Sequence, residues 1–280
     1  MIAGYLPASM TTYSRDYIGP SAALFVSGVG MILLAKYLDV VGVFAPDGLS
    51  GRRDTPSLFA ASVGVRHVHD PLMEYDFFSY LGLSASKGPF FLTEELDWAL
   101  SNENWRSRTT AGVRLPCPLL PQHAECRAVG VFTFHDFRPE RFSVMTVELQ
   151  AGVRMDMGWL SSSTKGAYFD LALGYGLQYV KWPGVASRFD EHQSLLLTRF
   201  ALGAYLGKGR GEVAFFYDQR HDTFAGGIRV GLSGDGSAGF AGVRGQYRFS
   251  TAWGLFAEVA VGNNTSSLVG ITYMGPKEEK

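Results

Sequence analysis

The stretch Val144–Trp159 reads VMTVELQAGVRMDMGW, and it decides the fold. Every second residue from Met145 to Trp159 is apolar, whereas the residues between them are polar, charged or small, with Glu148 and Arg154 among them. A β-strand points successive side chains to opposite faces, but a helix would scatter both sets around its circumference. The stretch therefore predicts a long strand that has one apolar face and one polar face.

The same alternation returns in Ala167–Tyr179, Ala241–Phe249 and Trp253–Val261, and less cleanly in Ser194–Leu206 and Glu212–Thr223. Strands of soluble proteins usually have ~5–6 residues, whereas a tilted strand needs ~9–11 residues to cross a bilayer. Long alternating stretches are therefore typical of transmembrane β-barrels. The alternative is a soluble sandwich or lipocalin-like barrel, because a strand with a buried face also alternates.

We expect an all-β protein that forms an antiparallel transmembrane β-barrel of about 14–16 strands, with 12 possible, in a single domain over residues 1–280. Turn signals such as Asp70-Pro71 and Asn263-Asn264 separate the strands. The expected strands lie near residues 22–33, 37–45, 58–68, 73–85, 90–101, 105–115, 127–137, 143–159, 166–181, 194–206, 211–223, 226–234, 238–250, 253–262 and 267–274, with a further one within 3–14.

Composition excludes several classes of protein. The net charge of −1 and the dispersed Lys and Arg residues argue against a nucleic-acid partner. The mean hydropathy of +0.04 is too low for a bundle of membrane helices. The longest apolar run, Ser21–Ala35, is shorter than the ~20 residues of a spanning helix. We interpret it as a strand, with the apolar region of a signal peptide as the alternative, and expect the chain to lie in the bacterial outer membrane, in contact with its lipid.

Two cysteines, Cys117 and Cys126, lie in the proline-rich stretch Pro116–Arg127. A disulfide that closes this small loop fits an oxidising compartment such as the periplasm or the cell surface. The alternative is a pair of free thiols. Two cysteines with only His123 between them make a poor zinc site. The pairs His67/His69 and His135-Asp136 are interpreted as residues near strand ends, so no metal site and no cofactor is expected.

The polar faces of the expected strands predict the lining of the barrel. At 12–16 strands the interior is expected to be polar and water-filled unless something plugs it. The predicted lining mixes both signs and has no ring of a single sign, which would have indicated ion selectivity. The residues are Glu148, Gln150, Arg154, Asp156, Asp170, Gln178, Arg199, Glu212, Asp218, Arg220, Asp222, Arg244, Gln246, Arg248 and Glu258.

This strand pattern resembles that of bacterial outer-membrane porin-like proteins over most of the chain. The last expected strand, Ser267–Met274, lacks the final aromatic residue that is typical of such barrels. The resemblance implies a channel for polar solutes or for an exported polymer such as polysaccharide, the latter with a periplasmic export partner. A structural or adhesive barrel without transport is a further alternative.

A second resemblance concerns His221-Asp222-Thr223-Phe224-Ala225-Gly226, which is similar to the His-x-Ser-x-Ala-Gly stretch of outer-membrane lipid A deacylases. It implies that His221 acts as a base and Thr223 as a nucleophile on one face of a strand, two residues apart. This sequence departs from the pattern because Thr223 replaces Ser and Phe224 replaces Asn. A lipid-modifying hydrolase is therefore an alternative, and a channel without catalysis is the expectation.

Overall fold

The computed structural model describes residues 58–70, 74–99, 105–119, 123–137, 142–159, 166–181, 191–206, 210–222, 237–262 and 265–274. These residues form twelve strands and one short 3-10 helix, η2 (Met157–Trp159). The strands are β1 (Leu58–Asp70), β2 (Glu74–Lys87), β3 (Phe90–Ala99), β4 (Trp105–Pro116), β5 (Ala124–Phe137), β6 (Phe142–Asp156), β7 (Ala167–Lys181), β8 (Glu191–Leu206), β9 (Gly211–Asp222), β10 (Ser237–Arg248), β11 (Trp253–Gly262) and β12 (Thr265–Met274).

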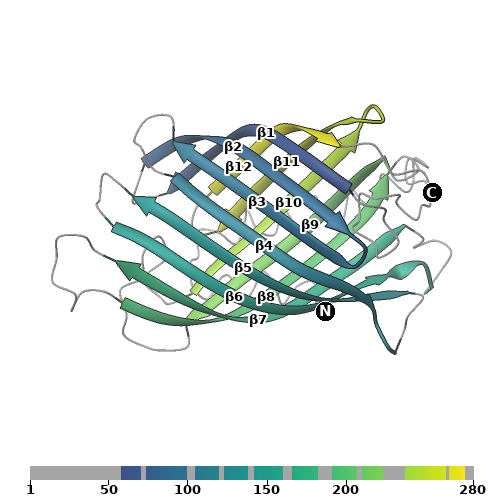
Figure 1. Cartoon of the computed structure of the whole chain (residues 1–280), viewed down its shortest axis with the longest axis horizontal. Coiled ribbons are helices and arrows are strands. Elements are labelled where there is room, and N and C mark those ends of the chain that lie inside the picture. The colour runs from purple at the N-terminus through teal and green to yellow at the C-terminus, as the bar shows by residue number, and fades with distance from the viewer. Residues whose placement is uncertain are drawn as a thin grey trace.

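The twelve strands close into a single antiparallel barrel, in which they run strongly tilted (Figure 1). Each strand pairs with its neighbour in sequence, and β1 closes the ring by pairing with β12 from Ala60 opposite Met274 to His69 opposite Thr265. Closure leaves no unpaired edge, which is what a β-structure needs inside a bilayer. The predicted antiparallel barrel is thus confirmed.

The expected number of 14–16 strands is wrong, and the lower value of 12 holds. The expected strands within 3–14, 22–33, 37–45 and 226–234 lie outside the described residues. Since β9 pairs directly with β10, the stretch 226–234 adds no strand between them. Apolar alternation over a short stretch shows that a strand is compatible with the sequence, but not that the strand joins the sheet.

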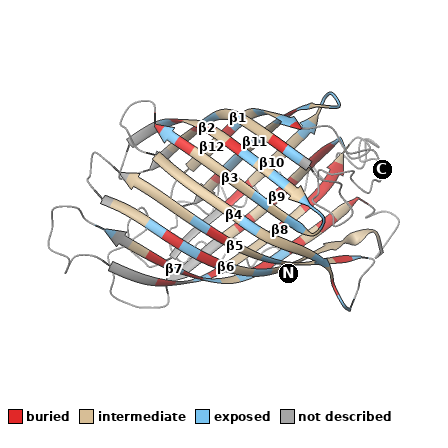
Figure 2. Ribbon diagram, in the orientation of Figure 1, coloured by how far each residue is buried: buried red, intermediate tan, exposed pale blue. Residues whose placement is uncertain are grey.

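Contacts that skip a strand identify the inner face. Arg66 of β1 bonds to Asp97 of β3 across β2, and the Tyr80 ring of β2 lies 5.7 Å from the Phe256 ring of β11. Residues directly opposite each other on neighbouring strands share a face. The register therefore carries this assignment around the barrel, and exposed and buried residues alternate along many strands (Figure 2).

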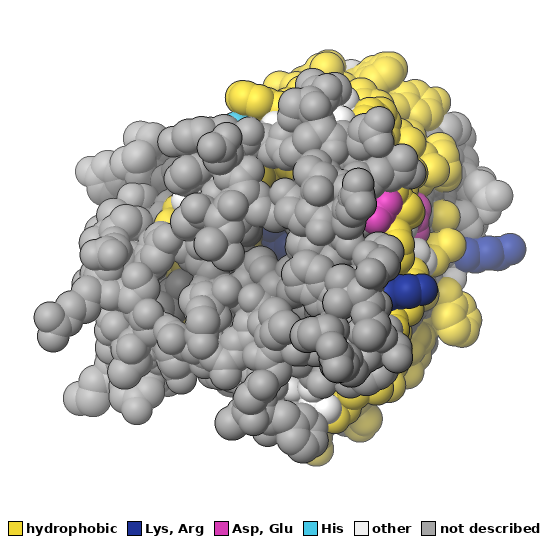
Figure 3. Space-filling view, turned by 90° about the vertical axis from the view of Figure 1, so that its left-hand side faces the viewer, with side chains coloured by type: hydrophobic (Ala, Val, Ile, Leu, Met, Phe, Trp, Pro, Cys, Tyr) yellow, Lys and Arg dark blue, Asp and Glu magenta, His cyan; other side chains and the backbone are white. Residues whose placement is uncertain are grey.

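The outer face is apolar and largely exposed. Leu149 is 70% exposed and Phe90 66%, and hydrophobic side chains cover most of the coloured outer surface in Figure 3. Aromatic residues stand near strand ends, as Trp253 does beside Tyr273 with ring centroids 5.2 Å apart. A closed barrel with an apolar outer band and aromatic ends is the architecture of outer-membrane proteins.

Part of the outer face is buried. On β9 and β10 the outward positions Phe215, Tyr217 and Ala241 are buried and form a cluster with Phe200 and Val243. No helix among the described residues is long and apolar enough to cross a membrane.

Aromatic side chains lie against glycines on the inner wall. A side-chain carbon added at Gly203 of β8 would lie 2.3 Å from Cζ of Tyr168 on β7, which is far closer than two such atoms can approach. Phe216 covers Gly242 of β10 in the same way. Such pairs fill the space that a glycine leaves on a curved sheet and fix the register of the strands.

The β4–β5 hairpin is closed by a disulfide between Cys117 and Cys126, whose Cα atoms lie 5.0 Å apart. The amide of Cys117 also donates to the carbonyl of Ala124 over 3.0 Å. This hairpin lies at the end of the barrel where β12 ends, which we call the terminal end. It is the right-hand end in Figure 1.

Candidate functional site in the barrel interior

A carboxylate held between two arginines organises the terminal end of the interior. Asp170 of β7 is 2% exposed. One of its oxygens accepts a hydrogen bond from Arg127 of β5, and the other accepts one from Nε of Arg154 of β6 over 3.1 Å. Burying a carboxylate is costly unless it is paired and hydrogen-bonded. The two arginines therefore satisfy both oxygens of Asp170 on the inner wall.

An aromatic layer continues this network toward β10. The guanidinium of Arg154 lies 4.4 Å from the centre of the Tyr168 ring, a cation–π contact. The Tyr168 hydroxyl donates to Glu212, which also accepts from Nε2 of Gln246 over 3.0 Å. The ring of Tyr205 lies 5.1 Å from that of Tyr168.

Each residue of this network lies within the first or last four residues of its strand, at the terminal end. We call the set the terminal belt. It spans the inner wall from β5 to β10, which is half of the strands in the ring. Its members are Arg127, Arg154, Tyr168, Asp170, Tyr205, Glu212 and Gln246.

A second network repeats the arrangement on the other side of the barrel. Asp97 of β3 accepts from Nε of Arg66 over 3.0 Å and from Arg106 of β4. Arg66 lies 5.4 Å from the Tyr80 ring, and the Tyr80 hydroxyl donates to Glu95 over 3.1 Å. Both networks thus contain a carboxylate between two arginines, one of which stacks on a tyrosine that bonds to a glutamate.

Further polar pairs line the middle of the strands. Arg199 of β8 bonds to Asp218 of β9 over 3.1 Å, Arg108 lies 3.8 Å from Glu95, and Gln150 donates to the buried Glu148 over 2.9 Å. Together with the Asp97 network these residues make up what we call the central belt. Its members are Arg66, Tyr80, Glu95, Asp97, Arg106, Arg108, Glu148, Gln150, Arg199 and Asp218.

The register places all the predicted lining residues on the inner face. Arg154 lies opposite Asp170, and Arg244 lies opposite Glu258. Arg220 and Asp222 are placed by backbone register alone. The belts bring together Glu148, Gln150, Arg154, Asp170, Arg199, Glu212, Asp218 and Gln246, whereas Asp156, Gln178, Arg244, Arg248 and Glu258 are inner positions outside the two sets.

The candidate catalytic pair lies partly outside the described residues. His221 occupies an outward position on β9, opposite Ser237, and Thr223 lies outside the described residues. His67 faces outward with its ring 4.7 Å from that of Phe77. The base–nucleophile pair of His221 and Thr223 therefore stays a prediction.

Sequence reasoning missed the part of the lining that comes from β1 to β5, five of the twelve strands. In β4 the outward positions Ser107 and Thr109 are polar like the inward arginines, so apolar alternation is weak there. The strand itself was expected near residues 105–115, and the signal that would have identified its inner face is the recurrence of arginine at Arg106, Arg108 and Arg114. The missed inner residues include Arg66, Tyr80, Glu95, Asp97, Arg106, Arg108 and Arg127.

Comparison with known proteins gave similarities in structure and no match in sequence. The sequence matches no protein-family model and no curated protein. In structure the chain is similar to a KdgM porin (13% identity, TM-score 0.48, covering 76% of this chain and 98% of the porin). It is also similar to the translocator domain of the autotransporter NalP from Neisseria meningitidis (14% identity, TM-score 0.49, covering 88% of this chain and 96% of that domain). A third similar structure is an anion-selective porin from Comamonas acidovorans (10% identity, TM-score 0.37, covering 78% of this chain and 100% of the porin). Porins are outer-membrane β-barrels, and the closed ring of twelve strands independently assigns this chain to that architecture.

Proposed function

We propose that this barrel is an outer-membrane channel through which small polar solutes diffuse passively. The observation that carries the proposal is the contrast between the two faces of the closed wall. The outer face is apolar, as at Leu149, while the inner face carries the two belts of charged residues. A polar inner wall that is separated from lipid by a continuous sheet supports a water-filled path.

The pairing of charges suggests the class of solute. In both belts the aspartates pair with arginines, while Glu148 and Glu212 bond to neutral side chains, so the wall offers hydrogen-bond donors and acceptors without a ring of one sign. Such a lining suits neutral polar solutes and discriminates weakly between small cations and anions. A barrel of twelve strands lies between the filled barrels of ~8 strands and the wide pores of ~16, which favours small solutes over folded cargo.

The test is conductance of the purified, folded protein in planar bilayers. We expect discrete current steps whose size falls as neutral polymers small enough to enter the lumen are added. Complete absence of steps from protein that shows the migration of a folded barrel in unheated detergent gels would overturn the proposal. Passage of a long polysaccharide in a vesicle assay, with small sugars passing no faster, would favour polymer export instead.

The lipid-modifying alternative has its own readout. If His221 were a catalytic base, expression of the protein would shift the mass of lipid A, and His221→Ala would abolish the shift. Under the channel proposal the lipid A mass is the same with the protein, with the His221→Ala variant and without either.

A further inference from the structure

Two arginines face each other directly on the inner wall at the terminal end. Arg114 of β4 lies opposite Arg127 of β5 in the register of the two strands. Arg127 reaches across β6 to Asp170 of β7, which places both arginines on the inner face. Directly opposite side chains have Cβ atoms ~4.5–5.5 Å apart, and like charges in such a pair repel each other. The pair is therefore unfavourable unless negative charge compensates it.

The negative charge beside this pair is one unit too small. The charged groups that act most strongly on Glu125 are Arg114, Arg127, Arg154 and Asp170, and those that act most strongly on Arg114 are the other four members of the same set. We call these five residues the arginine cluster. Three arginines and two carboxylates leave a net charge of +1. Glu212 and Arg244, which extend the network toward β10, add one charge of each sign.

One donor of the arginine cluster is buried without an acceptor. Nε of Arg127 makes no hydrogen bond to any described residue, although another nitrogen of the same guanidinium bonds to Asp170. Buried polar groups are normally satisfied, and an orphaned one can mark the place of an ion. This observation does not depend on the count of charges, and it too indicates a missing acceptor.

The guanidinium of Arg114 is held in place by an aromatic ring. It lies 4.0 Å from the centre of the Phe91 ring. That ring in turn lies against Gly112, where an added side-chain carbon would be 2.6 Å from Cζ of Phe91. A guanidinium that stacks through its face directs its N–H groups along its edges, in a fork that matches the oxygens of a carboxylate or a phosphate.

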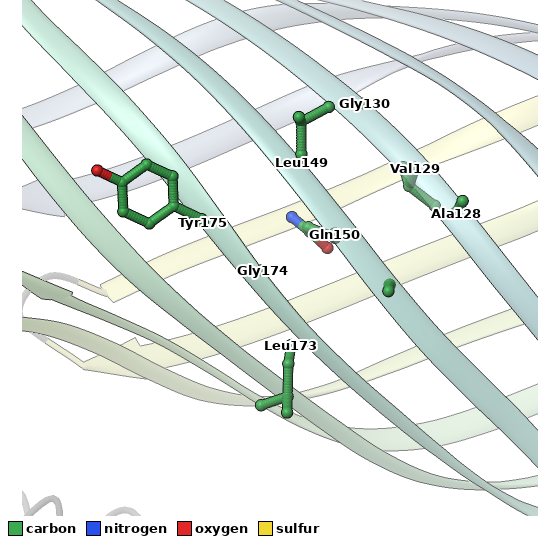
Figure 4. A pocket seen from close by; sticks show the side chains of 9 residues that line it. Ala128, Val129, Gly130, Leu149, Gln150, Leu173, Gly174 and Tyr175 are labelled. Atoms are coloured by element: carbon green, nitrogen blue, oxygen red, sulfur yellow. The ribbon is translucent and has the colours of Figure 1, made fainter.

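The membrane side of the wall cannot supply the missing charge. The outer face of β5, β6 and β7 forms an apolar groove in which Gly130, Leu149 and Tyr175 take part (Figure 4). These are the strands that carry Arg127, Arg154 and Asp170 on their inner face. Since hydrocarbon holds no counter-ions, an anion can reach the arginine cluster only from the lumen.

We propose that the arginine cluster is a binding site for one small oxyanion, a carboxylate or a phosphate, that enters from the lumen. Its oxygens accept hydrogen bonds from the guanidiniums of Arg114 and Arg127, and its charge balances the cluster. Two oxygens on one centre match the paired N–H groups of a guanidinium, which favours an oxyanion over chloride.

Calorimetric titration of the folded protein in detergent tests the site. Inorganic phosphate and acetate are titrated separately in ~0.1 M sodium chloride, where the screening length is ~10 Å. We expect one anion to bind per chain, and the anion that binds more tightly identifies the class of ligand. Arg114→Gln removes a charged donor and should weaken binding at least about tenfold.

The matched control is Arg108→Gln, which makes the same change on the inward row of the same strand. This position is ~20 Å from Arg114 at ~3.3 Å per residue, so its charge is screened and the affinity should stay within about threefold of that of the native chain. Arg114→Lys keeps the charge but loses the fork, and it replaces Arg114→Gln if that variant does not fold. Gel migration of the unheated protein confirms folding in each case.

The inference is overturned if neither anion binds to the folded protein, if Arg114→Gln binds as tightly as the native chain, or if Arg108→Gln weakens binding equally. Binding measured by calorimetry does not require conduction. A barrel that binds phosphate or acetate without conducting would contradict the proposed function alone, and a conducting barrel that binds neither would contradict this inference alone.

Discussion

Replacing Asp170 by Asn is expected to make the channel favour anions. Asp170 is the carboxylate that forms an ion pair with both Arg127 and Arg154 in the terminal belt. Asn has nearly the same shape but no charge, so the substitution adds one net positive charge to the inner wall and leaves two arginines without their counter-ion.

The size of the effect follows from Coulomb's law. A unit charge ~5 Å from the path of an ion changes its energy by about 0.8 kcal/mol in a water-like dielectric. This raises the local anion concentration about fourfold and lowers that of cations by a similar factor, so the permeability ratio should shift by about sixteenfold at low salt. At ~1 M salt, where the screening length is about 3 Å, the shift should largely disappear.

The assay is the reversal potential across a planar bilayer under a gradient of potassium chloride. The matched control is Asp136→Asn, which makes the same chemical change at an outward position of β5, where Trp105 Nε1 donates to the carboxylate over 3.3 Å. An unchanged reversal potential in folded, conducting Asp170→Asn, or an equal shift in Asp136→Asn, would refute the assignment of Asp170 to the ion path.

Three further outcomes are expected. Leu149→Arg puts a charge on the exposed outer face and should lower the free energy of unfolding in lipid by ~2–4 kcal/mol. The control Gln150→Arg, on the inner face, should lower this free energy much less. Urea titration in vesicles measures both, and equal losses would contradict the assigned faces. Gly203→Ala should destabilise the barrel by ~1–3 kcal/mol because its new carbon clashes with Tyr168. The control Gly245→Ala should be tolerated, since its nearest neighbour would lie 3.6 Å away, and the same titration measures both. Reducing the disulfide of the β4–β5 hairpin should lower the free energy of unfolding by at most ~3 kcal/mol, because the disulfide closes only a short loop. Unfolding of the whole barrel on reduction, measured by circular dichroism, would contradict this prediction.

The sequence by itself determined the strands and their two faces. Side-chain direction alternates along a strand for local geometric reasons, so the apolar row from Met145 onward and the polar row that contains Glu148 and Arg154 could be assigned without a partner. The bounds of β6 and β11 agree closely with those expected. The same local rule placed Asp170 and Asp218 on the inner face.

Only the tertiary structure decided the number of strands, their register and which charges meet. Alternation is a property of one stretch of chain, but membership in the ring depends on pairing with a neighbour, which for β1 is β12 at the far end of the sequence. The bond from Arg66 to Asp97 skips a strand and depends on the curvature of the wall. The meeting of Arg114 with Arg127 likewise depends on the register of β4 and β5.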